Sequence, residues 1–229
     1  MSQFDEVTIA EEREKTYRFL SGLCLNPPSD VLIAMIKNRS IMSLFEDDGE
    51  SRSWEEMAKF VALSSQIDDM SDELAAERTA LFVLPSSHLP HEAVYLDKDK
   101  RLGGRVTISV GQFYEKAGAD VLDSCIEMPD HIGMELEFMA FLCKMEKDMR
   151  ESGDHAGLNN CIHLQKKFLD AHLLKWVYQC CEKIAERAKY GFYKAVAYLI
   201  IEFVKSEEEY VEELYAGTDA GYRLHDAAL

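Results

Sequence analysis

Apolar residues recur every three or four positions along most of this chain, which is the spacing of one face of an α-helix. The first stripe of this kind stops at Asn26-Pro27-Pro28, where consecutive prolines end a helix. From Ile132 to Met145 apolar residues occupy two sides of the expected helix, which is typical of a central helix. The pattern therefore predicts an all-α fold, a single globular domain that resembles a helical bundle.

Three further helices are expected in the last third of the chain. Residues 158–184 have the pattern of one long amphipathic helix, and residues 192–203 that of a last buried helix. An acidic stretch then begins at Lys205 and is expected to form a short helix ending near Leu214. The tail from Gly217 is expected to fray, as chain ends commonly do.

The middle of the chain breaks this regularity. Residues 84–111 hold two prolines and three glycines, so we expect a proline-containing, extended loop with at most a short helical turn. Within it, Val106–Val110 alternates between apolar and polar positions like a strand. Because five residues without a partner strand are rarely stable, extended coil or the lead into a helix at Gln112 is expected there.

A polar segment that is poor in helical pattern, residues 118–130, separates two helical halves. We therefore expect an N-terminal lobe of residues 1–117, a hinge connector of residues 118–130 and a C-terminal lobe of residues 131–229. A hinge allows two copies of a chain to exchange halves at low cost. Both a monomer and a domain-swapped homodimer are compatible with this organisation.

Charge narrows the range of partners. The 229 residues include 25 Lys and Arg against 42 Asp and Glu, and 25 − 42 gives a formal net charge of −17. Such a charge repels nucleic-acid phosphates and anionic lipids, and it attracts basic partners over long distances. The alternative is that the negative charge only keeps the protein soluble. We therefore expect no nucleic-acid partner, and we leave open whether the charge has a binding role.

The sequence also favours a cytoplasmic location. The first residues are acidic and contain no apolar run of the kind found in secretion signals. The longest uninterrupted apolar stretch, Ala195–Ile201, is far shorter than the roughly 20 residues of a membrane-spanning helix. Six cysteines form no C-x-x-C pair and mostly lie among apolar residues, as reduced core cysteines do.

The densest cluster of polar side chains runs from Glu127 to Glu135. Pro129 and Asp130 suit the first turn of a helix, so the cluster has the pattern of a helix start. His131 and Glu135 share a helical face, and together with Glu127 they could bind zinc or iron in a metal-dependent hydrolase. The paired Glu-x-x-His helices of di-iron bundles are missing, and the residues alone leave both interpretations open.

Patterns of nucleophilic and phosphate chemistry are missing from the sequence. A second polar cluster, His88–Glu92, lies in the loop without a partner motif, and there is no G-x-S-x-G segment. Arg101–Arg105 contains two glycines but lacks the G-x-x-x-x-G-K-[ST] order, so we expect a turn. No residue pattern calls for a catalytic group, a resident metal, or a nucleotide or pterin cofactor. The sequence therefore favours a binding protein.

An amphipathic, basic peptide would need apolar contacts and an acidic rim, and the loop and connector offer both. The apolar side chains are Phe82, Leu84, Pro90 and Tyr95, and the acidic ones are Glu92, Asp97, Asp99, Glu127 and Asp130. A helical scaffold protein could have the same composition, so this pattern alone does not establish peptide binding.

Several motifs occur in an informative order. Glu127–Met139 reads E-M-P-D-H-I-G-M-E-L-E-F-M, and upstream Leu81–Pro85 reads L-F-V-L-P and Leu89–Leu96 reads L-P-H-E-A-V-Y-L. Further motifs are Phe113-Tyr114 with Gly118, an F-x-x-x-H-L-x-x-W pattern made by Phe168, His172, Leu173 and Trp176, and the pair Phe192-Tyr193. In this order the motifs resemble those of the TorD/DmsD family of chaperones for molybdenum-containing oxidoreductases.

The resemblance spans residues 74–205 and implies a cytoplasmic chaperone rather than an enzyme. Such a chaperone binds the N-terminal twin-arginine leader of the apo-form of a catalytic subunit, assists cofactor insertion and prevents premature export. The alternative is a NarJ-like assembly factor for a molybdoenzyme that is not exported. The sequence departs from the family pattern at two positions: His91 stands where the family often has Tyr or Trp, and Ala93 stands where it often has Ser. These departures bear on peptide selectivity. The expected peptide-binding residues are Phe82, Leu84, Pro90, His91, Glu92, Tyr95, Glu127, Pro129, Asp130 and His131.

Overall fold

The computed structural model describes residues 3–45, 51–84, 90–120 and 127–226, with side chains described from Asp5 to Thr218. These residues form helices joined by short connections, and the one extended pairing among them is an isolated β-bridge. The prediction of an all-α fold is therefore confirmed.

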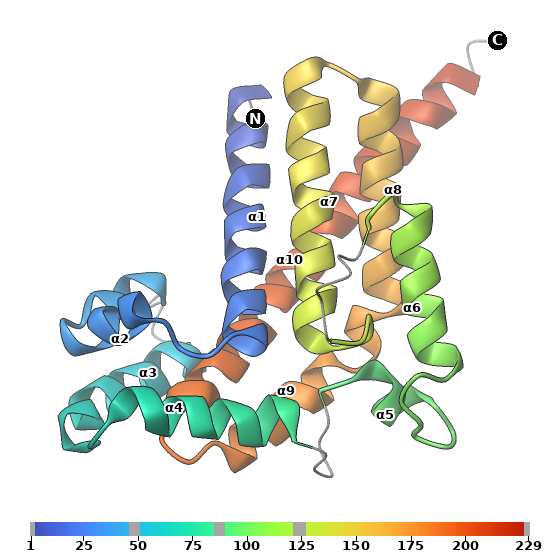
Figure 1. The fold of residues 1–229 in the computed structure, drawn as a ribbon. Coiled ribbons are helices and arrows are strands. Elements are labelled where there is room, and N and C mark those ends of the chain that lie inside the picture. The colour runs from blue at the N-terminus through green and yellow to red at the C-terminus, as the bar shows by residue number, and fades with distance from the viewer. Residues whose placement is uncertain (1–2, 46–50, 85–89, 121–126, 227–229) are drawn as a thin grey trace.

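Long helices form the upper part of the molecule (Figure 1). They are α1 (Gln3–Leu25), α7 (Ile132–Ser152), α8 (His155–Ala171) and α10 (Phe192–Asp226). Helix α7 lies between α1 and α8 and contacts both, while α10 crosses behind them and contacts α8. The first helix of the chain thus packs mainly on a helix from its second half.

Shorter helices form the lower part of the molecule (Figure 1). On one side are α2 (Asp30–Lys37), η1 (Ser40–Leu44), α3 (Arg52–Leu63), η2 (Ser64–Gln66), α4 (Met70–Arg78) and the π-helical turn η3 (Thr79–Val83). Of the other short helices, α5 (Glu92–Leu96) lies at the lower right, α6 (Arg105–Lys116) stands beside α8, and α9 (Val177–Arg187) lies between α4 and α5, preceded by the turn η4 (Leu173–Lys175). Ser29 and Ser51 cap α2 and α3 by accepting hydrogen bonds from backbone amides, and α3 packs on α10.

Helix α7 is the central helix that its two apolar stripes predict. Its buried side chains include Leu136, Phe138, Met139, Leu142 and Cys143. The five described cysteines are buried free thiols, and the sixth, Cys125, lies outside the described residues. Burial raises the pKa of thiols such as Cys180, to about 12, which suits reduced core cysteines.

A buried ion network joins the four long helices. The Arg13 guanidinium of α1 donates to Glu146 on α7 at 2.6 Å, to Gln165 on α8 at 2.7 Å and to Glu207 on α10 at 2.8 Å. Arg150 donates to the other side of the Glu146 carboxylate at 2.9 Å. Each buried charge therefore has an opposite charge and hydrogen bonds, which is the condition for tolerating charges in a core.

The extended coil expected at Val106–Val110 is wrong, because these residues already lie in α6, ahead of the helix expected at Gln112. The helix buries Thr107, Val110 and Tyr114, a spacing of three and four, whereas Ile108 is 55% exposed. Alternation over five residues therefore mimicked a strand within a helix that begins after Gly104. The extended stretch expected up to Gly111 ends at Gly104, where α6 begins with the next residue.

Two helix boundaries in the last third also differ from expectation. The single helix expected over residues 158–184 is interrupted between Ala171 and Val177, where His172 and Trp176 leave helical geometry. The break between the last two expected helices does not exist, since α10 runs from Phe192 to Asp226. Its acidic stretch contains good helix formers, and Glu207 turns inward to bind Arg13.

The two expected lobes, residues 1–117 and 131–229, remain a prediction. The connector between them, residues 118–130, is described only at residues 118–120 and 127–130.

Among the described residues, no single helix has the length and hydropathy to cross a membrane. Segments Asp5–Leu25 and Asp30–Lys37 meet that test only as a pair, and they are bent by 104°.

Candidate functional site

Two segments about 40 residues apart in the chain meet below α7 and form a small extended pairing. The Ile132 amide donates to the Pro90 carbonyl at 2.8 Å, and the Glu92 amide donates to the Asp130 carbonyl at 2.9 Å. His91 and His131 face each other across this antiparallel bridge. We call residues 90–93 together with residues 127–133 the elbow. It joins the start of α5 to the start of α7.

Asp130 fastens the elbow from the inside. Its fully buried carboxylate accepts a hydrogen bond from the Ala93 amide at 3.1 Å and so satisfies the first turn of α5. Its second oxygen lies 3.6 Å from Nδ1 of His91. Burial alone would raise the pKa of Asp130, but the His91 imidazole and the Ala93 amide outweigh it and lower that pKa. Asp130 is therefore an ionised, structural carboxylate.

His131 begins α7 and is likewise structural. Its Nδ1 accepts a hydrogen bond from the Gly133 amide at 3.0 Å, as a helix-capping side chain does. The remaining hydrogen is then on Nε2, which faces the Phe82 carbonyl at 3.4 Å. Burial and the neighbouring His91 lower the pKa of His131 to about 3, so the ring is neutral at physiological pH.

A second ring of polar contacts supports the elbow. Nδ1 of His172 lies 3.0 Å from the Glu92 carboxylate, and the Trp176 indole donates to Glu135 at 3.1 Å. Burial and the nearby Glu92 carboxylate raise the pKa of Glu135 well above its usual value, which favours its protonated form. These contacts account for the interruption between α8 and α9, because both His172 and Trp176 point at the elbow instead of continuing a helix.

Neighbouring helices brace the elbow. The Tyr114 hydroxyl of α6 donates to the Pro129 carbonyl at 2.7 Å. At Gly133 a Cβ would lie 2.6 Å from Cγ of Leu25, so α7 approaches the end of α1 as closely as only glycine allows. The sequence had not singled out Tyr114, Glu135 or Gly133 as elbow supports. For His172 and Trp176 a signal existed, namely their four-residue spacing in the F-x-x-x-H-L-x-x-W motif.

The structure divides the ten expected binding residues into two groups. The buried group holds the elbow together and consists of Phe82, Pro90, His91, Glu92, Asp130 and His131. The other group reaches the surface and consists of Leu84, Tyr95, Glu127 and Pro129. Leu84 is 51% exposed, beside Val83 at 47%, and Met128 of the elbow is 37% exposed. Exposed apolar side chains therefore occur both in the elbow and in the segment that follows Phe82.

Among the described residues, no three His, Cys, Asp or Glu side chains are placed to hold a metal ion. Glu127 does not join His131 and Glu135 in such a group, because His131 caps α7 and Glu135 binds Trp176. His88 of the second polar cluster lies outside the described residues.

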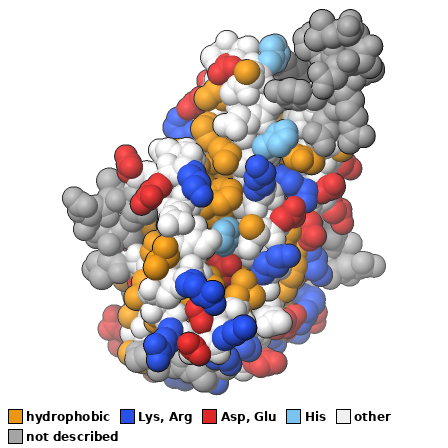
Figure 2. All heavy atoms as spheres, turned by 90° about the vertical axis from the view of Figure 1, so that its right-hand side faces the viewer, with side chains coloured by type: hydrophobic (Ala, Val, Ile, Leu, Met, Phe, Trp, Pro, Cys, Tyr) orange, Lys and Arg blue, Asp and Glu red, His pale blue; other side chains and the backbone are white. Residues whose placement is uncertain are grey.

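The face that carries α6 and α8 shows an apolar band bordered by charges of both signs (Figure 2). At its lower end, the turn between α5 and α6 exposes Lys98, Lys100, Arg101 and Arg105. Arg101–Arg105 is indeed a turn leading into α6, as its glycines predicted. Basic side chains thus collect locally on a protein whose net charge is −17.

Comparison with known proteins identifies the family. Residues 46–182 match the family described as nitrate reductase delta subunit, which is more than half of the chain. The chain belongs to this family. It is 26% identical over 214 residues to the chaperone protein TorD of Vibrio cholerae serotype O1, covering 91% of this chain and 96% of that one. TorD of Vibrio vulnificus is 25% identical over 207 residues, covering 88% and 95%.

A crystal structure from Archaeoglobus fulgidus, described as a redox enzyme maturation protein, is 17% identical in sequence. It covers 87% of this chain and 93% of its own with a TM-score of 0.45. The expected membership of the TorD/DmsD family, whose members are chaperones for molybdenum-containing oxidoreductases, is confirmed by the family match and the TorD relatives. The chain is accordingly a chaperone of this family, and a hydrolase built on His131 is set aside.

Proposed function

We propose that this chaperone acts in the cytoplasm and binds the N-terminal leader of the apo-form of a molybdopterin-containing catalytic subunit. By holding that subunit it assists cofactor insertion and prevents export before the cofactor is in place. The observation that carries the proposal is the arrangement at the elbow. Asp130 and His131 each bond a backbone amide in the buried part of the elbow, while the side chains of Val83, Leu84 and Met128 are exposed and offer apolar contacts to a peptide.

The division into buried and exposed residues sharpens the roles at the elbow. Asp130 is fully buried, so an incoming guanidinium could reach its carboxylate only by displacing the residues that cover it. Glu127 reaches the surface in the same segment. We therefore assign the charge contact with the leader to Glu127, and to Asp130 and His131 the task of holding the elbow in shape.

A leader with two arginines suits this surface because guanidinium groups form strong paired hydrogen bonds with carboxylates. The net charge of −17 would draw such a leader in from a distance. The second candidate is a NarJ-like assembly factor, favoured by the match to the nitrate reductase delta subunit family. It would bind a leader without the arginine pair.

The test is to titrate synthetic leaders of molybdoenzymes from the same genome, by calorimetry at low and high salt. We expect the affinity for the leader to fall as the salt concentration rises. Changing both arginines of the leader to glutamine should lower the affinity about tenfold or more, and Glu127→Gln in the chaperone should lower it by a similar factor. An arginine-free leader that binds equally well, with little salt dependence, would establish the NarJ-like role. If no leader binds, leader recognition itself is wrong.

A pair of matched variants locates the binding surface. Leu84→Asp places a charge at an exposed apolar position two residues after Phe82, whose carbonyl faces His131 of the elbow, and we expect at least tenfold weaker leader binding. Leu63→Asp is the control, because Leu63 is 57% exposed at the end of α3 and is not part of the elbow. Equal affinities for the two variants would contradict the elbow as the leader site.

A further inference from the structure

A groove lies between α1 and α10, away from the elbow. Its main hollow has a volume of about 780 Å³, and a neighbouring hollow adds about 460 Å³. The two hollows share Glu12, Thr16, Phe203 and Ser206, so they form one continuous groove. The groove shares no lining residue with the elbow.

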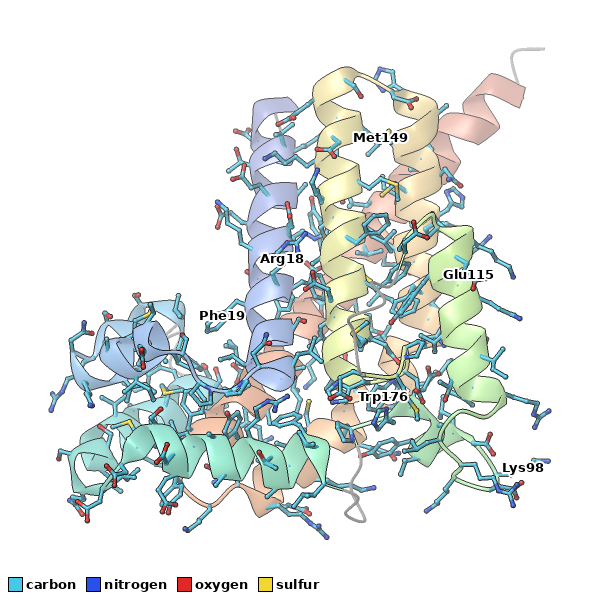
Figure 3. All side chains as sticks on the ribbon, in the orientation of Figure 1. Arg18, Phe19, Lys98, Glu115, Met149 and Trp176 are labelled. Atoms are coloured by element: carbon cyan, nitrogen blue, oxygen red, sulfur yellow. The ribbon has the colours of Figure 1, made fainter. Side chains whose placement is uncertain are left out.

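The lining of the groove is apolar between its polar edges. Phe19 of α1 and Leu199 and Phe203 of α10 are only partly buried, and Leu44 at one end is 40% exposed. Figure 3 shows the Phe19 side chain leaving α1 on the side away from α6, into the space beside the α2–α4 group. Phe203 is held in place by Tyr17, whose ring lies 4.7 Å away edge-on. These side chains offer surface for an apolar ligand.

The charges on the groove walls favour a cationic partner. The Glu202 carboxylate accepts hydrogen bonds from the Ser51 hydroxyl and from the Ser53 amide and hydroxyl, and among the described residues it has no Lys or Arg partner. Lys15, which lines the main hollow, is engaged by Glu12 at 2.9 Å and by a second glutamate of α1. Arg13 and Glu207 at the base neutralise each other. The groove therefore presents a carboxylate without a counter-ion beside apolar side chains.

The walls also determine the shape of the ligand. Lining residues extend from Thr8 to Phe19 on α1 and from Leu199 to Tyr210 on α10. At 1.5 Å per residue this is roughly 16 Å, or three turns of a docked helix. Because both walls are helices whose backbone groups are bonded internally, an extended peptide would find no backbone to pair with. A helix that packs through its side chains fits better.

We propose that this groove is a second docking site, which binds an amphipathic, basic helix of a partner protein. The apolar face of that helix packs on Phe19, Leu199 and Phe203, and a Lys or Arg at its edge pairs with Glu202. The site is separate from the elbow, so the chaperone can hold a leader and a second segment of a client at the same time. The groove does not depend on the assignment of the leader to the elbow.

The test uses a fluorescent model helix with leucines on one face and flanking arginines, together with a shuffled peptide of equal composition. Ser206→Trp fills the groove where its two hollows join, and we expect at least tenfold weaker binding of the model helix. Lys205→Trp is the control, since residue 205 is exposed and projects from a different face of α10. Glu202→Gln keeps the contacts with the serine hydroxyls, and we expect a several-fold loss of affinity that high salt removes.

Circular dichroism and melting temperature establish that each variant is folded. Unchanged affinity of Ser206→Trp, or equal binding of the shuffled peptide, would overturn the proposal. Weaker binding of the model helix by Leu84→Asp would also overturn the proposal, because that result would place the binding site of the model helix beside the elbow and not in the groove. A dimer of the wild-type chain that Ser206→Trp converts to monomer, without binding of the model helix, would make the groove a self-interface instead. A leader that fails to bind at the elbow would leave the groove result intact.

Discussion

At the scale of single residues, the elbow shows how ionisable side chains can serve shape rather than chemistry. Asp130 satisfies an amide of α5, and His131 satisfies an amide of α7. Each side chain takes the place of a backbone partner that the first turn of a helix lacks. Of the groups that suggested a metal site in the sequence, His131 thus caps α7 and Glu135 accepts a hydrogen bond from Trp176.

The neutral state of His131 predicts a pH dependence of stability. Its pKa is about 3 in the folded protein and about 6.5 in an unfolded chain, so below pH 6.5 the unfolded state binds a proton that the folded state does not. Stability is therefore lost as pH falls through this window, by about 2 kcal/mol between pH 7 and pH 5 from this group. Urea unfolding at the two pH values measures the difference.

Asparagine at position 131 can still cap a helix but does not titrate, so His131→Asn should lose most of this pH dependence. His155→Asn serves as the control, because His155 is exposed at the start of α8 and should keep the wild-type difference. An identical change in unfolding free energy between pH 7 and pH 5 for wild type and His131→Asn would contradict the account of this residue.

At the scale of elements, spacing alone predicted the helices well and their ends less well. The end of α1 before Pro27 and the two-sided character of α7 follow from local sequence. The interruption at His172 does not, because its cause is a contact with Glu92, 80 residues away. Likewise, the elbow sequence could be located, but burial of Asp130 could not be inferred without the fold around it.

The buried ion network at Arg13 was invisible to sequence periodicity, and it predicts how α1 is attached. Arg13→Met leaves the buried Glu207 carboxylate without its guanidinium partner and leaves Glu146 paired with Arg150 alone. We expect a loss of about 3–5 kcal/mol in the free energy of unfolding, measured by urea denaturation at pH 7.

Arg18 provides the matched control on the same helix. It pairs with Glu14 and with Glu137 of α7, but its side chain is 46% exposed. Arg18→Met should therefore cost less than about 1 kcal/mol. Similar losses for the two variants would mean that the buried network does not determine how α1 is held.

At the scale of the whole molecule, the two halves of the chain interlock. Helix α1 packs on α7, and α3 packs on α10. Helix α6, which precedes the connector, also holds the far end of the connector, since the Tyr114 hydroxyl donates to the Pro129 carbonyl. An exchange of halves between two copies would keep the helix contacts but require the connector to open. We therefore expect the closed monomer to be the stable form in dilute solution.

Crosslinking across the halves tests this expectation. Arg18 and Glu137 lie in different halves and are joined at 2.7 Å, so cysteines at both positions can be bridged by a short bismaleimide. A closed monomer gives a crosslinked band at the mass of one chain on a denaturing gel, whereas a swapped dimer gives a band at the mass of two. The single variants Arg18→Cys and Glu137→Cys control for the chain's own cysteines. Because a swapped dimer preserves the same contact between different chains, a double-mass band that persists on dilution would establish the exchange of halves.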